Sequence, residues 1–295
     1  MKTSEILKHP PLVLTNEQRH FYFDNGYLLL EKIVPEQMLE RLRKVTNQMI
    51  DQSRSITVSD EVWDLEQDHT SESPRLRRLT SPNDQHEVYW EYASSELIGN
   101  IVADLVGPDV KFHHSKLNFK WARGGEEVKW HQDIQFWPHT NYSPLTVGLY
   151  LYDCSHEQGP LVVLPESHKG ELYDQYNQSG QWTGCLSDVD AARLDTTIAA
   201  ELEGPAGSLT IHNCRMLHSS MPNRSDIGRP LLLNAYSSAD AMPYTPVPTR
   251  SKYFQTIIRG SAARWAHHDE RPCQIPPDWS GGYTSIFALQ QEEAM

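Results

Sequence analysis

The chain has 295 residues, with 26 lysines and arginines against 39 aspartates and glutamates, so its formal net charge is −13. A hydrophobic fraction of 38% is typical of globular proteins and excludes a disordered chain. The negative charge disfavours a nucleic-acid partner, because binding phosphates requires a positive field.

The sequence shows no apolar run of membrane-spanning length and no apolar leader at its start. Its four cysteines lie far apart, with no pair at zinc-ligand spacing, and are expected to be reduced thiols. These features predict a cytoplasmic protein without a membrane partner. The sequence leaves the oligomeric state open.

The N-terminal part, residues 1–109, is predicted to be mainly helical. Thr15 is expected to cap a helix that Gly26 ends, and Pro35 opens a second helix with one apolar face. Residues 27–30, between these helices, have strand character.

The next segment, residues 53–85, is polar and has no clear period, which predicts a long surface loop. The basic cluster from Arg75 to Arg78 lies within it. We interpret this cluster as solvated charge rather than as a contact to an anionic substrate. Helical periodicity returns over 95–105.

From residue 110 the pattern changes to short apolar runs separated by glycine and proline. These runs cover residues 110–114, 117–121, 145–152, 161–164, 208–212 and 230–236. Many short strands with such turns favour a β sandwich or barrel. We therefore predict one domain, with a β core over 110–240 and a C-terminal extension of loop and short helix over 241–295.

The tripeptide His131-Gln132-Asp133 is the sharpest local motif. In a strand, residues i and i+2 point to the same face, so His131 and Asp133 would project together. His218 is the best candidate for a third ligand, and two histidines with one carboxylate suit iron(II). A buried His–Asp pair that satisfies its own hydrogen bonds is the alternative.

A second candidate, Arg229, follows His218 in a strand-like stretch. Its planar guanidinium could clamp a carboxylate in the same cavity, or it could form a surface ion pair. The segment 159–170, GPLVVLPESHKG, reads as a buried strand that runs into a tight turn.

Over about residues 14–244 the sequence resembles the phytanoyl-CoA hydroxylase-like family of Fe(II)/2-oxoglutarate-dependent oxygenases. The resemblance rests on HQD at 131–133, on GPLVVLPESHKG, on HSSMPNRSDIGRP at 218–230, and on the opening LTNEQRHFYFDNGYLLLEKIV. It implies a mainly β protein with flanking helices, whose double-stranded β-helix (a jelly-roll, cupin-like core) follows N-terminal α-helices.

The resemblance also implies roles for single residues. Iron(II) would be held by His131, Asp133 and His218, and 2-oxoglutarate would be anchored by Arg229. Further contacts to this cosubstrate are expected from Ser220, Asn118 and Thr146. The substrate would meet His114, Gln135 and Trp137.

The predicted function is a dioxygenase that hydroxylates an unactivated C–H bond of a small, polar molecule, consuming O2 and releasing succinate and CO2. A carboxylate at Asp133 favours hydroxylation, because halogenases of this type need a small residue there to admit a halide. A cupin-like metal enzyme that does not use 2-oxoglutarate and a non-catalytic jelly-roll binding module are the alternatives.

Overall fold

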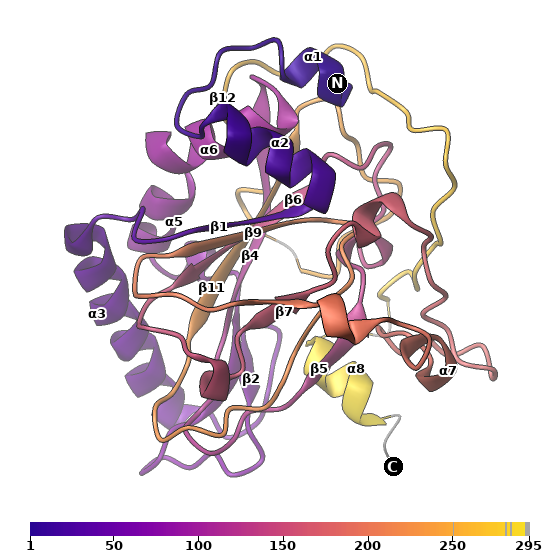
Figure 1. Ribbon diagram of the computed structural model, residues 1–295. Coiled ribbons are helices and arrows are strands. Elements are labelled where there is room, and N and C mark those ends of the chain that lie inside the picture. Colours follow the sequence, from indigo (N-terminus) through magenta and orange to yellow (C-terminus); the bar gives the residue numbers. More distant parts are fainter. Residues whose placement is uncertain (250, 281, 284, 293–295) are drawn as a thin grey trace.

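The computed structural model describes residues 1–249, 251–280, 282–283 and 285–292. Two antiparallel sheets form its centre, and helices cover the outer face of the larger sheet (Figure 1). The larger sheet has the strand order β1-β9-β6-β11-β4-β3-β2, with β12 paired to β4, and the smaller has the order β5-β10-β7-β8. The predicted double-stranded β-helix with N-terminal helices is confirmed.

The strands of the larger sheet are β1 (Tyr27–Leu30), β2 (Trp63–Leu65), β3 (Leu76–Thr80), β4 (Val110–Asn118), β6 (Leu145–Tyr150), β9 (Leu209–Asn213), β11 (Leu231–Ser238) and β12 (Ile257–Arg259). Those of the smaller sheet are β5 (Val128–His131), β7 (Leu161–Val163), β8 (Ala200–Leu202) and β10 (His218–Ser220). The α-helices are α1 (Thr3–Ile6), α2 (Asn16–Asn25), α3 (Glu36–Gln52), α4 (Pro82–Gln85), α5 (Glu87–Ala93), α6 (Glu96–Val106), α7 (Asp188–Ala191) and α8 (Ile286–Glu292). In the described part of the chain, no helix has both the length and the apolarity to cross a bilayer.

The predicted helix signals act as expected. The Thr15 hydroxyl accepts a hydrogen bond from the backbone N–H of Gln18 at the start of α2, and Gly26 ends that helix with a φ of 85°. The apolar stripe of α3, which includes Leu39 and Leu42, is buried in one core cluster with strands of the larger sheet. Burial of this stripe fixes the helices against the outer face of the sheet.

The prediction of a surface loop over 53–85 is wrong. This segment contains β2 and β3, which extend the larger sheet beyond β4. The basic cluster is not solvated either, because Arg77 and Arg78 are buried. Polar strands of three to five residues are too short for periodicity to reveal, and tertiary contacts decide their structure.

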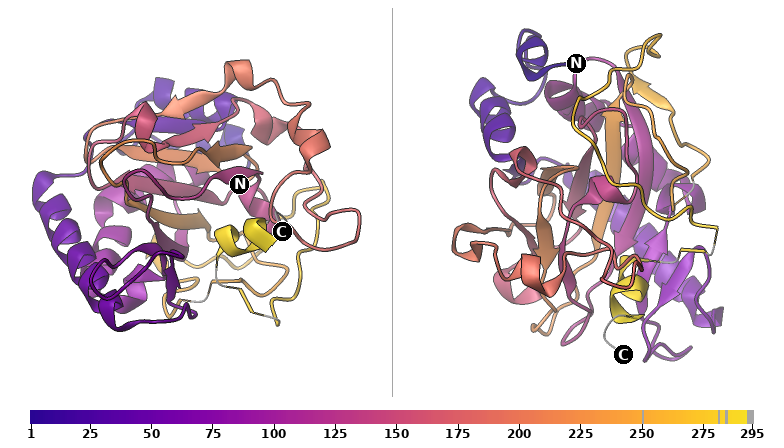
Figure 2. Two further views of the ribbon diagram at one scale, coloured as in Figure 1. Left: turned by 90° about the horizontal axis from the view of Figure 1, so that it is seen from below. Right: turned by 90° about the vertical axis from the view of Figure 1, so that its right-hand side faces the viewer.

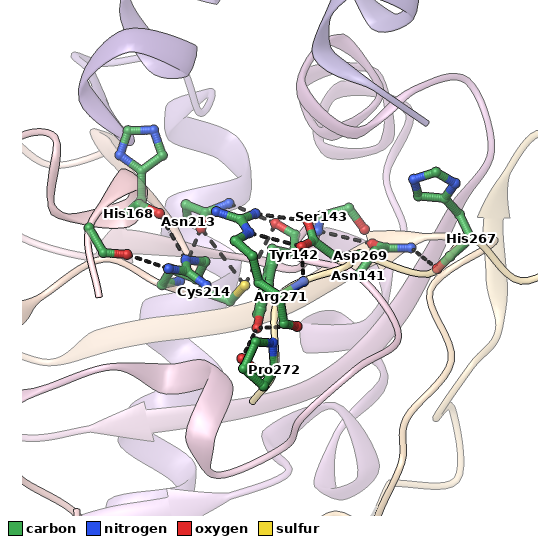
Figure 3. A network of polar contacts seen from close by, with 12 residues as sticks. Asn141, Tyr142, Ser143, His168, Asn213, Cys214, His267, Asp269, Arg271 and Pro272 are labelled. Carbon is green, nitrogen blue, oxygen red and sulfur yellow. Dashed lines mark hydrogen bonds and ion pairs between the residues drawn. The ribbon is translucent and has the colours of Figure 1, made fainter. Parts of the chain in front are cut away.

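The C-terminal segment runs along the outside of the molecule and ends in α8 beside the smaller sheet (Figures 1 and 2). The network in Figure 3 fastens it to the core. Arg271 forms a two-bond ion pair with Asp269, and its guanidinium lies 4.7 Å from the ring centre of Tyr142. The Tyr142 hydroxyl donates a hydrogen bond of 2.8 Å to the carbonyl of Pro272.

A half-buried acidic side chain beside β2 gives a stability prediction. Burial, and then the negative charge of Glu126, raise the pKa of Glu66 to about 7. The unfolded state therefore loses this proton at a lower pH than the folded state, so the cost to folding grows between about pH 4.5 and pH 7. Glu66→Gln should raise the melting temperature at pH 8 and have little effect at pH 4.5. Exposed Glu61, changed to Gln, is the control, and an equal shift at both pH values would contradict the prediction.

Candidate active site

Two strands of the smaller sheet bring the candidate metal ligands together. β5 and β10 pair antiparallel, with His218 directly opposite His131. β5 ends at His131, and Asp133 begins a 3-10 turn over Asp133–Gln135. The sequence suggested that Asp133 and His131 share one face of a strand. In the structure, Asp133 instead reaches the same place through this turn.

The three side chains enclose a point that a divalent ion could occupy. The Nε2 atoms of His131 and His218 each lie 3.8 Å from Oδ1 of Asp133, and the two imidazole centres are 4.0 Å apart. One ligand atom from each side chain lies within 4.8 Å of the others, and all three residues are buried. Two histidines and one carboxylate in this arrangement are the donor set of non-haem iron(II) oxygenases.

The backbone fixes which histidine nitrogen faces the metal position. Nδ1 of His131 donates to the carbonyl of Lys129, and Nδ1 of His218 donates to the carbonyl of Met216, both at 2.9 Å. With the proton on Nδ1, the lone pair of each Nε2 is directed at the site. Burial lowers the pKa of His131 to about 4, so its imidazole is neutral at pH 7, as coordination requires.

Neighbouring groups hold Asp133 as a carboxylate. Burial alone would raise its pKa. The positive charge of Lys116 has the largest opposing effect, and the neighbouring His218 and His212 add to it, so the pKa lies well below its usual range. Its second oxygen, Oδ2, accepts a hydrogen bond from the hydroxyl of Thr146 at 2.9 Å and lies 3.3 Å from Nε2 of His212. These contacts leave Oδ1 directed at the two ligand histidines.

A cavity beside the triad contains a pair of buried cations. Lys120 and Arg229 exchange backbone hydrogen bonds of 2.7 and 3.2 Å, and both side chains line this cavity. Arg229 donates from Nη2 to the carbonyl of Gly159, but its buried Nε has no partner among the described residues. Burial, and then the charge of Arg229, lower the pKa of Lys120 well below its usual range. A guanidinium beside the triad whose Nε–H has no partner among the described residues fits a cosubstrate with a free carboxylate.

Residues 22–231 match the phytanoyl-CoA dioxygenase (PhyH) family. The chain belongs to the phytanoyl-CoA dioxygenase family. A probable alpha-ketoglutarate-dependent hypophosphite dioxygenase of Stutzerimonas stutzeri is 32% identical over 93% of this chain and 96% of its own. L-proline trans-4-hydroxylase of Streptomyces griseoviridis is 29% identical over 59% of this chain and 72% of its own.

The chain shares its fold with solved structures. The crystal structure of EctD from S. alaskensis with 2-oxoglutarate and 5-hydroxyectoine superposes with a TM-score of 0.66 and 20% identity, covering 86% of this chain and 88% of that one. With the triad in place, this phytanoyl-CoA dioxygenase family member is an Fe(II)/2-oxoglutarate-dependent dioxygenase. A cupin-like enzyme without 2-oxoglutarate and a binding module without catalysis are therefore not supported.

In this family member the residues expected to contact the cosubstrate lie around the same cavity, which Ser220, Asn118 and Thr146 all line. Two of them are also engaged elsewhere. Thr146 holds Asp133, and Oδ1 of Asn118 accepts a hydrogen bond from Nε of Arg78 at 3.0 Å.

The residues expected to contact the substrate separate into two places. His114 and Trp137 line a second cavity that reaches His131 and Asp133 from another side. Gln135 does not line it, because its amide donates to the carbonyl of Tyr173 on the far side of the turn.

Sequence reasoning missed three cations at the site, namely Arg78, Lys116 and Lys120. Lys116 and Asn118 follow His114 at intervals of two on β4, so all three project to the same face. That alternation was a signal present in the sequence. Arg78 had no such signal, because β3 was not recognised as a strand.

The hydrogen bond from Thr146 to Asp133 gives a testable role outside the ligand set. Thr146→Val should weaken Fe(II) binding about tenfold, because ligand orientation by a neighbouring hydrogen bond is typically worth that much in metal affinity. Anaerobic titration with Fe(II) measures the effect. Thr46→Val, which removes a buried hydroxyl bonded to Tyr89 in the helical layer, is the matched control. Unchanged affinity in Thr146→Val would contradict this role.

Proposed function

We propose that the protein binds Fe(II) through His131, Asp133 and His218 and hydroxylates a small polar molecule of the hypophosphite type. The observation that carries this proposal is that two separate cation-lined cavities meet at the triad. One suits 2-oxoglutarate, and the other suits a small substrate. The similarity to the S. stutzeri relative over nearly the whole length of both chains supports hypophosphite as the first substrate to test.

Arg229 and Lys120 have the position of a cosubstrate anchor. 2-Oxoglutarate is a dicarboxylate, so a cation on the far side of the cavity can hold one end while the other reaches the metal position. The unpartnered Nε of Arg229 offers a hydrogen bond to that carboxylate. Lys120, which donates to the carbonyl of Ser220 at 3.0 Å, is fixed close by and adds positive charge.

Bound iron would supply the oxidising chemistry, in which one atom of O2 enters succinate as 2-oxoglutarate loses CO2 and the other enters an X–H bond of the substrate. For hypophosphite, one P–H bond would become P–OH and give phosphite. For a carbon substrate, a C–H bond would become C–OH. The protein's own residues orient the two substrates and exclude water.

The size of the substrate cavity favours a very small molecule. Its volume is about 20 Å3, and its walls include His114, Lys116 and the aromatic rings of Phe136 and Trp137. The cosubstrate cavity, at about 50 Å3, is larger. The substrate cavity therefore favours a molecule smaller than 2-oxoglutarate, such as hypophosphite, over a long acyl chain.

Loss of the anchor should weaken cosubstrate binding selectively. In anaerobic protein loaded with Fe(II), 2-oxoglutarate chelation is followed by the visible charge-transfer band. Arg229→Gln should raise the Kd for 2-oxoglutarate by about 10- to 100-fold, as expected for loss of a hydrogen bond to a charged group. Arg224→Gln is the control, because this residue follows β10 outside both cavities. An unchanged Kd would remove Arg229 from the anchor.

Substrate turnover tests the rest of the proposal. Under air, with Fe(II) and 2-oxoglutarate, hypophosphite should stimulate succinate formation with one phosphite formed per succinate. L-Proline and ectoine, the substrates that the names of other relatives suggest, complete the panel. Stoichiometric hydroxylation of a carbon compound, with no response to hypophosphite, would overturn the P–H assignment but not the reaction type.

A further inference from the structure

Arg77 and Arg78 are neighbours on β3, but only Arg77 is paired with a carboxylate. Arg77 donates to both oxygens of Asp64, at 2.7 and 3.0 Å, and also pairs with Glu126 at 3.4 Å. Arg78 forms no ion pair with any described carboxylate, although it is only 1% exposed. Both guanidinium groups lie near the ring of Phe287, at 5.9 and 5.7 Å, but only Arg78 lines the substrate cavity.

The contacts that Arg78 does make hold it in place without neutralising it. Its Nε donates to Oδ1 of Asn118, and Nη1 lies 3.4 Å from the hydroxyl of Tyr283. The guanidinium carbon is 5.7 Å from the ring centre of Phe287. Nη2 is buried and has no hydrogen-bond partner among the described residues. An uncompensated buried charge is strongly unfavourable, so the geometry calls for an anion from outside the chain.

Lys116 is a second cation on the same face. The register pairs Arg78 with Asn118, and Lys116 lies two residues before Asn118 on β4. Burial lowers the pKa of Lys116, the Asp133 carboxylate opposes this shift, and the positive charge of Arg78 lowers the pKa further. The two cations are therefore close enough to repel each other. Both line the substrate cavity beside the triad, whose other charged wall residue is Asp133.

We infer that Arg78 and Lys116 form an anion subsite that selects a small monoanionic substrate and holds it beside the metal position. This inference rests on the proposed function and names the charge class of its substrate. Arg78 is a substrate-binding residue, and Asn118 and Tyr283 position it. The planar guanidinium can bind two oxygens of an oxyanion at once, which leaves the remaining X–H bonds free to face the iron.

Arg78 is distinct from the cosubstrate anchor, whereas Lys116 lines both cavities. The cavity that contains Arg78 is not lined by Arg229, Lys120 or Ser220. Asn118 contacts both regions. It lines the cosubstrate cavity and accepts the hydrogen bond from Arg78. Substitutions at Arg78 and Arg229 should therefore affect the two ligands separately.

The test uses full-length protein loaded anaerobically with Fe(II) and saturating 2-oxoglutarate. Binding of hypophosphite, phosphite and formate is measured by isothermal titration calorimetry, and 2-oxoglutarate binding by the charge-transfer band. Arg78→Gln should weaken hypophosphite binding by about 10- to 100-fold and leave the Kd for 2-oxoglutarate within about twofold. Arg229→Gln should show the reverse pattern. Under air, the KM for hypophosphite should rise in Arg78→Gln more than kcat falls.

Two further variants make the result specific. Arg78→Lys keeps the charge but loses the planar fork, so it should recover part of the affinity. Arg75→Gln removes the same charge from the residue just before β3, where it pairs with exposed Asp68, and should bind anions like wild type. Thermal melting checks each fold. If Arg78→Gln does not fold, Lys116→Gln gives the second measurement, with weaker anion binding expected.

The outcomes separate this inference from the proposed function. If wild type forms the charge-transfer band but binds none of the three anions, the anion subsite is overturned and the oxygenase remains. Equal anion affinity in wild type and Arg78→Gln also overturns it, as does tighter binding of zwitterionic proline or ectoine than of hypophosphite. Failure to form the band with bound Fe(II) overturns the proposed function, and this inference falls with it.

Discussion

The buried negative charge of Asp133 is the constraint on which the site depends. It is the one carboxylate on the walls of the two cavities in the described part of the chain, and it faces four cations, Arg78, Lys116, Lys120 and Arg229. The site therefore carries a local positive excess inside a protein of net charge −13. Bound anions would neutralise this positive excess and so stabilise the site. A dicarboxylate cosubstrate together with a small anionic substrate would supply them. Asp133 stays ionised in the same field, which keeps it available as a metal ligand.

The two sheets divide the work of building this site. The smaller sheet supplies His131 and His218 as directly paired residues on β5 and β10, and its backbone carbonyls orient both rings. The larger sheet supplies the surrounding charge and hydrogen bonds through alternate residues of its strands. One row across it joins His114, Ala235, Thr146 and His212. Regular pairing therefore converts sequence alternation into a polar inner wall, with the metal ligands on the opposite wall.

The parts of this structure that sequence could predict are those with a local physical signature. The helix cap at Thr15 and the left-handed Gly26 follow from short-range chemistry, and the ligand triad follows from a motif. Arg78 could not be found in this way. Only the fold shows that Asp64 neutralises its neighbour Arg77 and that Arg78 is left without a carboxylate among the described residues. In the sequence both were simply members of a basic cluster.

The walls of the substrate cavity come from inside the family match and from the segment that follows it. The family match ends at residue 231, after every triad residue, whereas Pro248, Thr249, Tyr283 and Ile286 on the substrate cavity lie beyond it. The other walls lie within the match and include Arg78 on β3, the strand next to the edge strand β2 of the larger sheet. The ion pairs and stacked guanidinium of Figure 3 tie the C-terminal segment to the core, so that its last part reaches Arg78. The cavity proposed to hold the substrate thus combines residues of the matched region with residues that follow it. Similarity over 93% of this chain is therefore more informative about the substrate than similarity confined to the matched region.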